Sequence, residues 1–117
     1  MLNRGIIEDC IRCLTLNPSV TVRDGREEEM TVRERVYAPE IQILATVLAQ
    51  YGYYDPDCLE HMEELRHTPI ARLSLNECFT WLTYIFRGEE TVAGHIQFYV
   101  ENGILLQLLK RLDELLV

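Results

Sequence analysis

Apolar residues recur at three- and four-residue spacing in several stretches of the chain, the spacing of one face of an α-helix. The first stretch predicts a helix over 3–16, which ends there because Pro18 disfavours helical backbone at Asn17. Its apolar stripe consists of Ile6, Ile7, Cys10, Ile11 and Leu14. The same periodicity predicts helices over 39–51, 55–66, 75–87 and 91–100, and a last one from 104 onward. We therefore expect 1–117 to form a single all-α domain, a compact bundle of five to six short helices.

Polar residues and prolines at the helix starts support these boundaries. Pro39 suits the first position of a helix, where a missing backbone N–H costs nothing. Ser74 and Glu77 have the spacing of a capping box, in which the two side chains reciprocally bind free backbone amides. Asp55 before Pro56 is a further start signal.

A charged insertion over 19–37 interrupts the helical pattern. Val20 and Val22 alternate with polar residues, and Asp24-Gly25 is a turn signal. Two interpretations compete: a small β-hairpin with strands near 19–23 and 30–36, or an irregular charged loop. We favour the hairpin, which must pack on the helices because an isolated two-stranded hairpin is only marginally stable. Its edge strand can also pair with its copy in a second chain.

The last helix carries the strongest interaction signal in the sequence. Leucines form two stripes along it, and a helix this apolar must be buried against something. A helix at the end of the chain has little of its own domain left to surround it. We therefore expect a homodimer whose protein interface comprises Leu105, Leu108, Leu112 and Leu115. The alternative is that the helix is buried inside one domain.

The charge balance narrows the function. Acidic residues number 19 against 11 basic ones, a formal net charge of -8. Because nucleic-acid binding needs a concentrated basic surface, we expect no direct nucleic-acid contact. The apolar runs are far shorter than the roughly 20 residues that span a bilayer, so no membrane association is expected. Acidic residues near the N-terminus argue against a signal peptide, so we expect a cytoplasmic protein.

Four cysteines raise the question of a metal site. Cys10 and Cys13, with Cys58 and His61, supply three thiolates and an imidazole, a set that can bind zinc tetrahedrally. However, both pairs fall within predicted helices, where cysteine commonly packs as a small apolar residue. We favour the packing interpretation and expect no metal and no cofactor.

The turn between the two most apolar helices is the candidate ligand-binding site. It brings together Arg87, Glu89 and His95 in sequence, with Trp81 and Tyr84 on the preceding helix. Glu89 and His95 are residue types that form acid–base pairs. The structural alternative is that the acid stabilises a helix N-terminus and Arg87 stabilises a helix C-terminus. The ligand hypothesis requires these side chains to converge on a cavity.

Parts of the last two-thirds of the chain resemble a family of small, mostly bacterial helical proteins known only as a domain of unknown function. The resemblance rests on residues 81–89, 94–96, 102–105 and 109–112, and on 36–40 with 54–55. It implies a bacterial or phage source and a helical fold, and no activity. The family motif, Arg-x-Glu-Arg-Phe at a helix end, is altered here, because Glu90 and Thr91 stand where Arg and Phe are expected.

Together these observations favour a non-enzymatic protein–protein interaction module that acts as a homodimer and engages a further protein. One alternative is a small-ligand-binding protein or enzyme with its site at 87–95. The other is an acidic inhibitor that mimics nucleic acid. Neither a nucleophile elbow nor a phosphate-binding loop occurs in the sequence.

Overall fold

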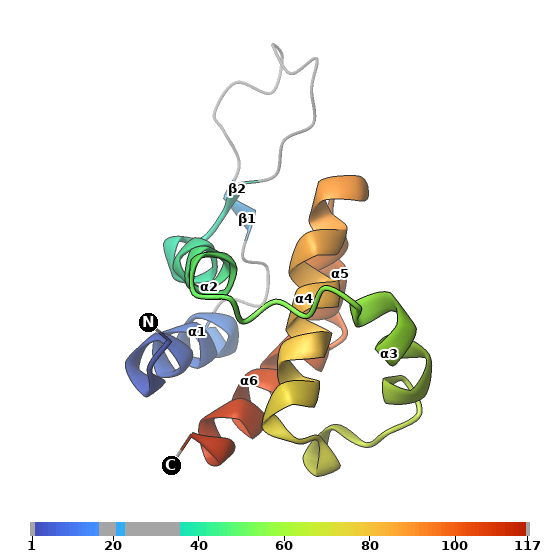
Figure 1. Ribbon diagram of the computed structural model, residues 1–117. Helices are drawn as coiled ribbons and strands as arrows, with labels where there is room; N and C mark the ends of the chain where they lie inside the picture. The colour runs from blue at the N-terminus through green and yellow to red at the C-terminus, as the bar shows by residue number, and fades with distance from the viewer. Residues whose placement is uncertain (1, 17–20, 23–35, 117) are drawn as a thin grey trace.

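Six α-helices follow one another in the computed structural model, which describes residues 2–16, 21–22 and 36–116 (Figure 1). They are α1 (Arg4–Leu16), α2 (Pro39–Gln50), α3 (Cys58–Leu65), α4 (Leu75–Thr91), α5 (His95–Glu101) and α6 (Ile104–Leu115), with a 3-10 turn η2 (Ile70–Arg72) before α4. The all-α bundle predicted from the periodicity is confirmed. The helices of this described part include none that is long and apolar enough to cross a membrane.

The two ends of the insertion pair as short strands. β1 (Thr21–Val22) and β2 (Val36–Tyr37) are antiparallel, with Thr21 opposite Tyr37 and Val22 opposite Val36. Over residues 21–22 and 36–37, this antiparallel pairing agrees with the hairpin interpretation. The remaining residues of the two predicted strands, 19–20, 23 and 30–35, lie outside the described residues, as does the predicted turn.

The boundaries of α4 and α5 differ from the prediction. Ser74 and Glu77 form the predicted capping box, with Ser74 Oγ accepting from the Glu77 amide at 3.2 Å and Glu77 Oε1 accepting from the Ser74 amide at 2.8 Å. The helix then continues through Gly88 to Thr91, beyond the predicted end at residue 87. The chain reverses only at Gly94, whose φ of 87° suits a residue without a side chain. α5 therefore begins at His95 rather than near Thr91.

The α6 helix lies in the core of the single chain. It packs against α1, α4 and α5, so helices from the two ends of the chain lie side by side. A side-chain ion pair joins them, with Arg4 Nε 3.1 Å from Asp113 Oδ1. Several α6 leucines have no exposed surface: Leu105, Leu108, Leu109 and Leu112.

The homodimer interface predicted on α6 is therefore wrong. Leu105, Leu108 and Leu112 are each 0% exposed within one chain, and Leu115 packs partly buried against the same core. The prediction failed because the spacing of leucines along α6 cannot show that α1, from the other end of the chain, packs over it. The alternative of a helix buried inside one domain is the one observed.

Candidate functional site

Five aromatic rings of α4 and α5 form what we call the aromatic cluster: Trp81, Tyr84, His95, Phe98 and Tyr99. Ring centroids of Tyr84 and Tyr99 lie 6.0 Å apart, and each lies 5.1 Å from the ring of His95. Trp81 contacts both tyrosines, and Phe98 lies 5.0 Å from Tyr99. All these contacts are edge-to-face, the geometry that aromatic quadrupoles favour. Three predicted site residues, Trp81, Tyr84 and His95, are therefore brought together.

His95 lies against the backbone of α4. Its Nδ1 is 2.9 Å from the Ile85 carbonyl oxygen. A carbonyl can only accept, so Nδ1 carries the hydrogen and neutral His95 keeps its lone pair on Nε2. The close approach of the imidazole to α4 depends on Gly88, because a Cβ atom at this position would lie 2.3 Å from two atoms of the imidazole. The glycine is thus required by the packing of a histidine from the next helix.

The cluster also includes a cation that sequence reasoning missed. Arg66, just after α3, donates from Nη2 to the Tyr84 hydroxyl at 3.2 Å, and its guanidinium carbon lies 5.4 Å from the centre of that ring. Burial raises the pKa of Tyr99 to about 12, and a hydrogen bond with Tyr84 adds to this effect. The Tyr99 hydroxyl is therefore protonated at neutral pH. The four-residue spacing of His95 and Tyr99 was a usable signal, but none in the sequence linked Arg66 to α4.

Glu89 serves a structural purpose on another side of α4. Its carboxylate accepts hydrogen bonds from the Tyr37 hydroxyl at 2.7 Å and from the amides of Gly94 and Ile96 at 2.8 and 2.9 Å. It thereby binds free amides at the start of α5 and connects that helix to β2. The acid–base pair expected between Glu89 and His95 does not form, because the two side chains bind different partners.

Arg87 also lies apart from the aromatic cluster. It is exposed, and its charge acts on Tyr54 and Cys58. Burial raises the pKa of both groups, and the Arg87 charge offsets part of that rise. The predicted ligand site at 87–95 is therefore divided among three environments, and the convergence that the ligand or enzyme hypothesis required is not observed.

The cysteines and His61 do not form the zinc set considered above. Cys10 and Cys13 are on α1, where the Cys10 thiol donates to the Glu40 carbonyl oxygen at 3.3 Å. Cys58 and His61 belong to α3 and have other neighbours. Across residues 2–16, 21–22 and 36–116, no group of three or more potential ligands is placed to hold a metal ion. All four cysteines are free, and burial raises the pKa of Cys10 to about 12.

His61 instead pairs with Asp55 at the start of α3. Its Nδ1 lies 2.6 Å from Asp55 Oδ2, and the same carboxylate accepts from the Thr80 hydroxyl at 2.7 Å and the Asp57 amide at 2.8 Å. Burial tends to raise the pKa of Asp55, but these hydrogen bonds together lower it below its usual value. The same hydrogen bond raises the pKa of His61. This pair connects α3 to α4 and orients an exposed imidazole.

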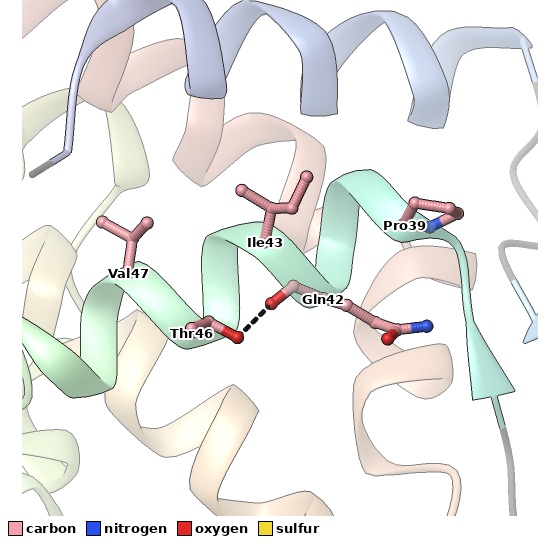
Figure 2. A pocket seen from close by; sticks show the side chains of 5 residues that line it. All are labelled: Pro39, Gln42, Ile43, Thr46 and Val47. Carbon is pink, nitrogen blue, oxygen red and sulfur yellow. Dashed lines mark hydrogen bonds between the residues drawn. The ribbon is translucent and has the colours of Figure 1, made fainter.

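The outer face of α2 carries a groove of about 340 Å³. Its lining residues define what we call the α2 face: Pro39, Gln42, Ile43, Thr46 and Val47. Figure 2 shows Pro39, Ile43 and Val47 projecting from the same side of the helix. The Thr46 hydroxyl donates to the Gln42 carbonyl oxygen of its own helix at 2.9 Å, so it leaves its methyl group for external contact. The α2 face therefore offers apolar surface without a charged side chain.

Comparisons with known proteins give no relative for this chain. Searches found no matching family model, no similar curated protein and no similar solved structure. The family resemblance of the sequence stays a prediction.

Proposed function

We propose that the protein is a non-enzymatic protein–protein interaction module that acts as a homodimer, and that two copies meet through the α2 face. The observation that carries this proposal is an uncharged, partly apolar surface on a strongly acidic chain. Ile43, at the centre of the α2 face, is 52% exposed although it is a large aliphatic residue. Patches of this kind on soluble proteins commonly mark interaction sites.

The lack of charged side chains on the α2 face allows a second copy to occupy it. Two chains that each carry a net charge of -8 repel one another, so they can approach closely only where carboxylates are absent. The single charged residue of α2 is Glu40, which is turned toward Cys13 on α1. Depletion of charged residues at the centre is also the compositional mark of protein interfaces.

The spacing of the apolar residues suits helix–helix packing. Pro39, Ile43 and Val47 follow one another at four-residue intervals and form a ridge along α2. Ridges of this spacing interdigitate when two helices cross at about -50°. A two-fold axis would place the same ridge of both copies at the contact.

The interface is small, which determines its expected strength. Twelve residues of α2 extend about 18 Å, and a stable interface usually covers about 800 Å² on each partner. We therefore expect a reversible dimer whose population rises with protein concentration over the micromolar to millimolar range.

Sedimentation equilibrium tests the proposal directly. The wild-type chain should shift from 13.7 kDa toward twice that mass as its concentration rises. Ile43→Glu should abolish the shift, because it places two carboxylates opposite each other in a desolvated contact. Leu59→Glu is the matched control. Leu59 is 75% exposed on α3, so this substitution introduces the same charge away from the α2 face.

Two results would overturn the proposal. The first is a wild-type chain that remains at 13.7 kDa at every concentration, even if Ile43→Glu lowers its melting temperature. That combination would indicate that the α2 face is covered within one chain. The second is a dimer that Ile43→Glu leaves intact.

The nucleic-acid mimic is less well supported. Such a mimic would need carboxylates in spaced rows on one face, whereas acidic residues occur on all six described helices. Several of them are already neutralised by arginine. Asp9 pairs with Arg12, and Glu114 pairs with Arg111, at 3.2 and 3.3 Å.

A further inference from the structure

The surface of the aromatic cluster has more hydrogen-bond donors than acceptors. Tyr84 and Tyr99 have two hydroxyl hydrogens, and at most one of them can lie between the two oxygens. The Tyr84 oxygen also receives an N–H from Arg66. Within the described residues, the second hydroxyl hydrogen therefore has no acceptor. The indole N–H of Trp81, in contact with both tyrosines, is buried and also lacks a partner in that part of the chain.

Arg66 adds an unneutralised charge to this surplus. The arginines of α1 and α6, Arg4, Arg12 and Arg111, all pair with carboxylates. Among the described residues, Arg66 is bonded only to the Tyr84 hydroxyl and its ring, although Glu63 and Glu64 are close in sequence. A guanidinium has five N–H donors in a planar fork, and most of these remain available. The tyrosine contact holds the fork in place beside the hydroxyls.

An apolar ring extends the same surface. Phe98 is 59% exposed and packs edge-to-face on Tyr99. Rigid aromatic rings with a neighbouring arginine are the residue types that contribute most to binding energy in protein interfaces. A ligand that uses both features needs an anionic oxygen and an apolar group next to it.

We propose that Arg66, Tyr84, Tyr99 and Phe98 form a binding site for an acidic side chain on an apolar segment of a partner protein. The carboxylate would accept from the guanidinium and from the free tyrosine hydroxyl, while its apolar neighbour packs on Phe98. This site is separate from the α2 face, and it does not depend on the homodimer.

Charge favours a carboxylate over a phosphate group. Arg66 supplies one positive charge, which balances a monoanion, and the guanidinium fork matches the two oxygens of a carboxylate. A phosphate near its dianionic form would carry an additional charge into the field of a chain whose net charge is -8.

The test uses short peptides and the lone tryptophan as a reporter. The chain has one Trp, so the indole N–H signal of Trp81 in an NMR spectrum reports on the cluster without ambiguity. The probe is a blocked peptide with adjacent phenylalanine and glutamate, and its comparison replaces glutamate with glutamine. Two further arms use inorganic phosphate and a peptide whose only carboxylate is its C-terminus.

The expected result is a saturable shift of the Trp81 signal with the glutamate peptide and binding at least about tenfold weaker with the glutamine peptide. Arg66→Gln should weaken binding to a similar degree, and Phe98→Ala should also weaken it. Arg72→Gln is the matched control, because Arg72 is an exposed arginine on η2 and should leave binding unchanged. Urea unfolding should show that the Arg66 variant remains fully folded under the conditions of the binding experiment.

Several outcomes would overturn this assignment. One is the absence of a saturable shift with the glutamate peptide, and another is equal binding of both peptides. Tighter binding of phosphate would assign the site to a different anion, and exclusive binding of the C-terminal carboxylate would assign it to chain ends. Equal loss in Arg66→Gln and Arg72→Gln would indicate a general charge effect. Because the shift is read on Trp81, these outcomes leave the α2 dimer test unaffected.

Discussion

Replacement of Gly88 by alanine should destabilise the protein, although the same change in most helices is stabilising. Alanine is a better helix former than glycine by about 1 kcal/mol, and Gly88 lies within α4. Here, however, the new Cβ atom would lie 2.3 Å from two atoms of the His95 ring and 2.8 Å from a third. The imidazole must leave its position, because the helix backbone on the other side cannot move.

The magnitude follows from the contacts that His95 would lose. Its hydrogen bond to the Ile85 carbonyl contributes about 1 kcal/mol. Its edge-to-face ring contacts with Tyr84 and Tyr99, both at 5.1 Å, contribute about 0.5–1.5 kcal/mol each. These losses exceed the gain in helix propensity. We therefore expect Gly88→Ala to lower the free energy of unfolding by about 1–3 kcal/mol.

Urea unfolding followed by circular dichroism and by Trp81 fluorescence measures this change. The control is the same substitution in a His95→Ala background. With the imidazole removed, Gly88→Ala should stabilise the protein by up to about 1 kcal/mol, so the sign of its effect should reverse. If Gly88→Ala stabilises the wild-type chain, the proposed dependence of Gly88 on His95 is refuted.

Three other substitutions test the structural roles assigned above. Glu89→Gln should lower the free energy of unfolding by about 2 kcal/mol, because it loses charge-assisted bonds to three donors; an unchanged thermal melt would contradict this. Leu108→Ala should cost about 2–5 kcal/mol in urea unfolding, since its side chain is 0% exposed; a stable variant with a changed oligomeric state would revive the α6 interface. For His61→Gln, the difference in melting temperature from wild type should depend on pH. The pKa of His61 is raised from 6.5, so the contribution of the His61–Asp55 pair is complete below that pH and is lost as pH rises through the folded-state value. The pKa of Asp55 is lowered from 3.8, so the contribution is also lost as pH falls through its folded-state value. A difference that stays constant from about pH 3 to 9 would exclude this pair as a source of stability.

The positions of the helices could be predicted because their signals are local. The capping box at Ser74 and Glu77 determines where α4 begins, and both bonds form within a few residues of the chain. Pro39 and the apolar periodicity likewise located α2. The end of α4 was missed because it depends on a distant contact. Gly88 stays within α4 because α5 packs against this part of the helix. Glu89 binds the amides that begin α5, and His95 of α5 binds the Ile85 carbonyl of α4.

The candidate site was predicted only in part for the same reason. Trp81, Tyr84 and His95 were grouped because they flank the turn between two apolar helices, and the structure brings their rings together. Glu89 was included because it is close in sequence, yet its carboxylate binds the amides that begin α5. Arg66 could not be identified, because a surface arginine after α3 gives no sign of the tyrosine that it contacts on α4.

The amino-acid sequence by itself determined the helical class, the approximate helices and the acidic surface of this protein. These properties follow from periodicity, capping and composition, which act within one or two turns or over the whole chain. Only the tertiary structure decided which apolar faces are covered. It buried the leucines of α6 beneath α1 and left Ile43 of α2 exposed. The physical reason is that an amphipathic stripe specifies that a face must be buried, whereas the partner that buries it is set by long-range packing.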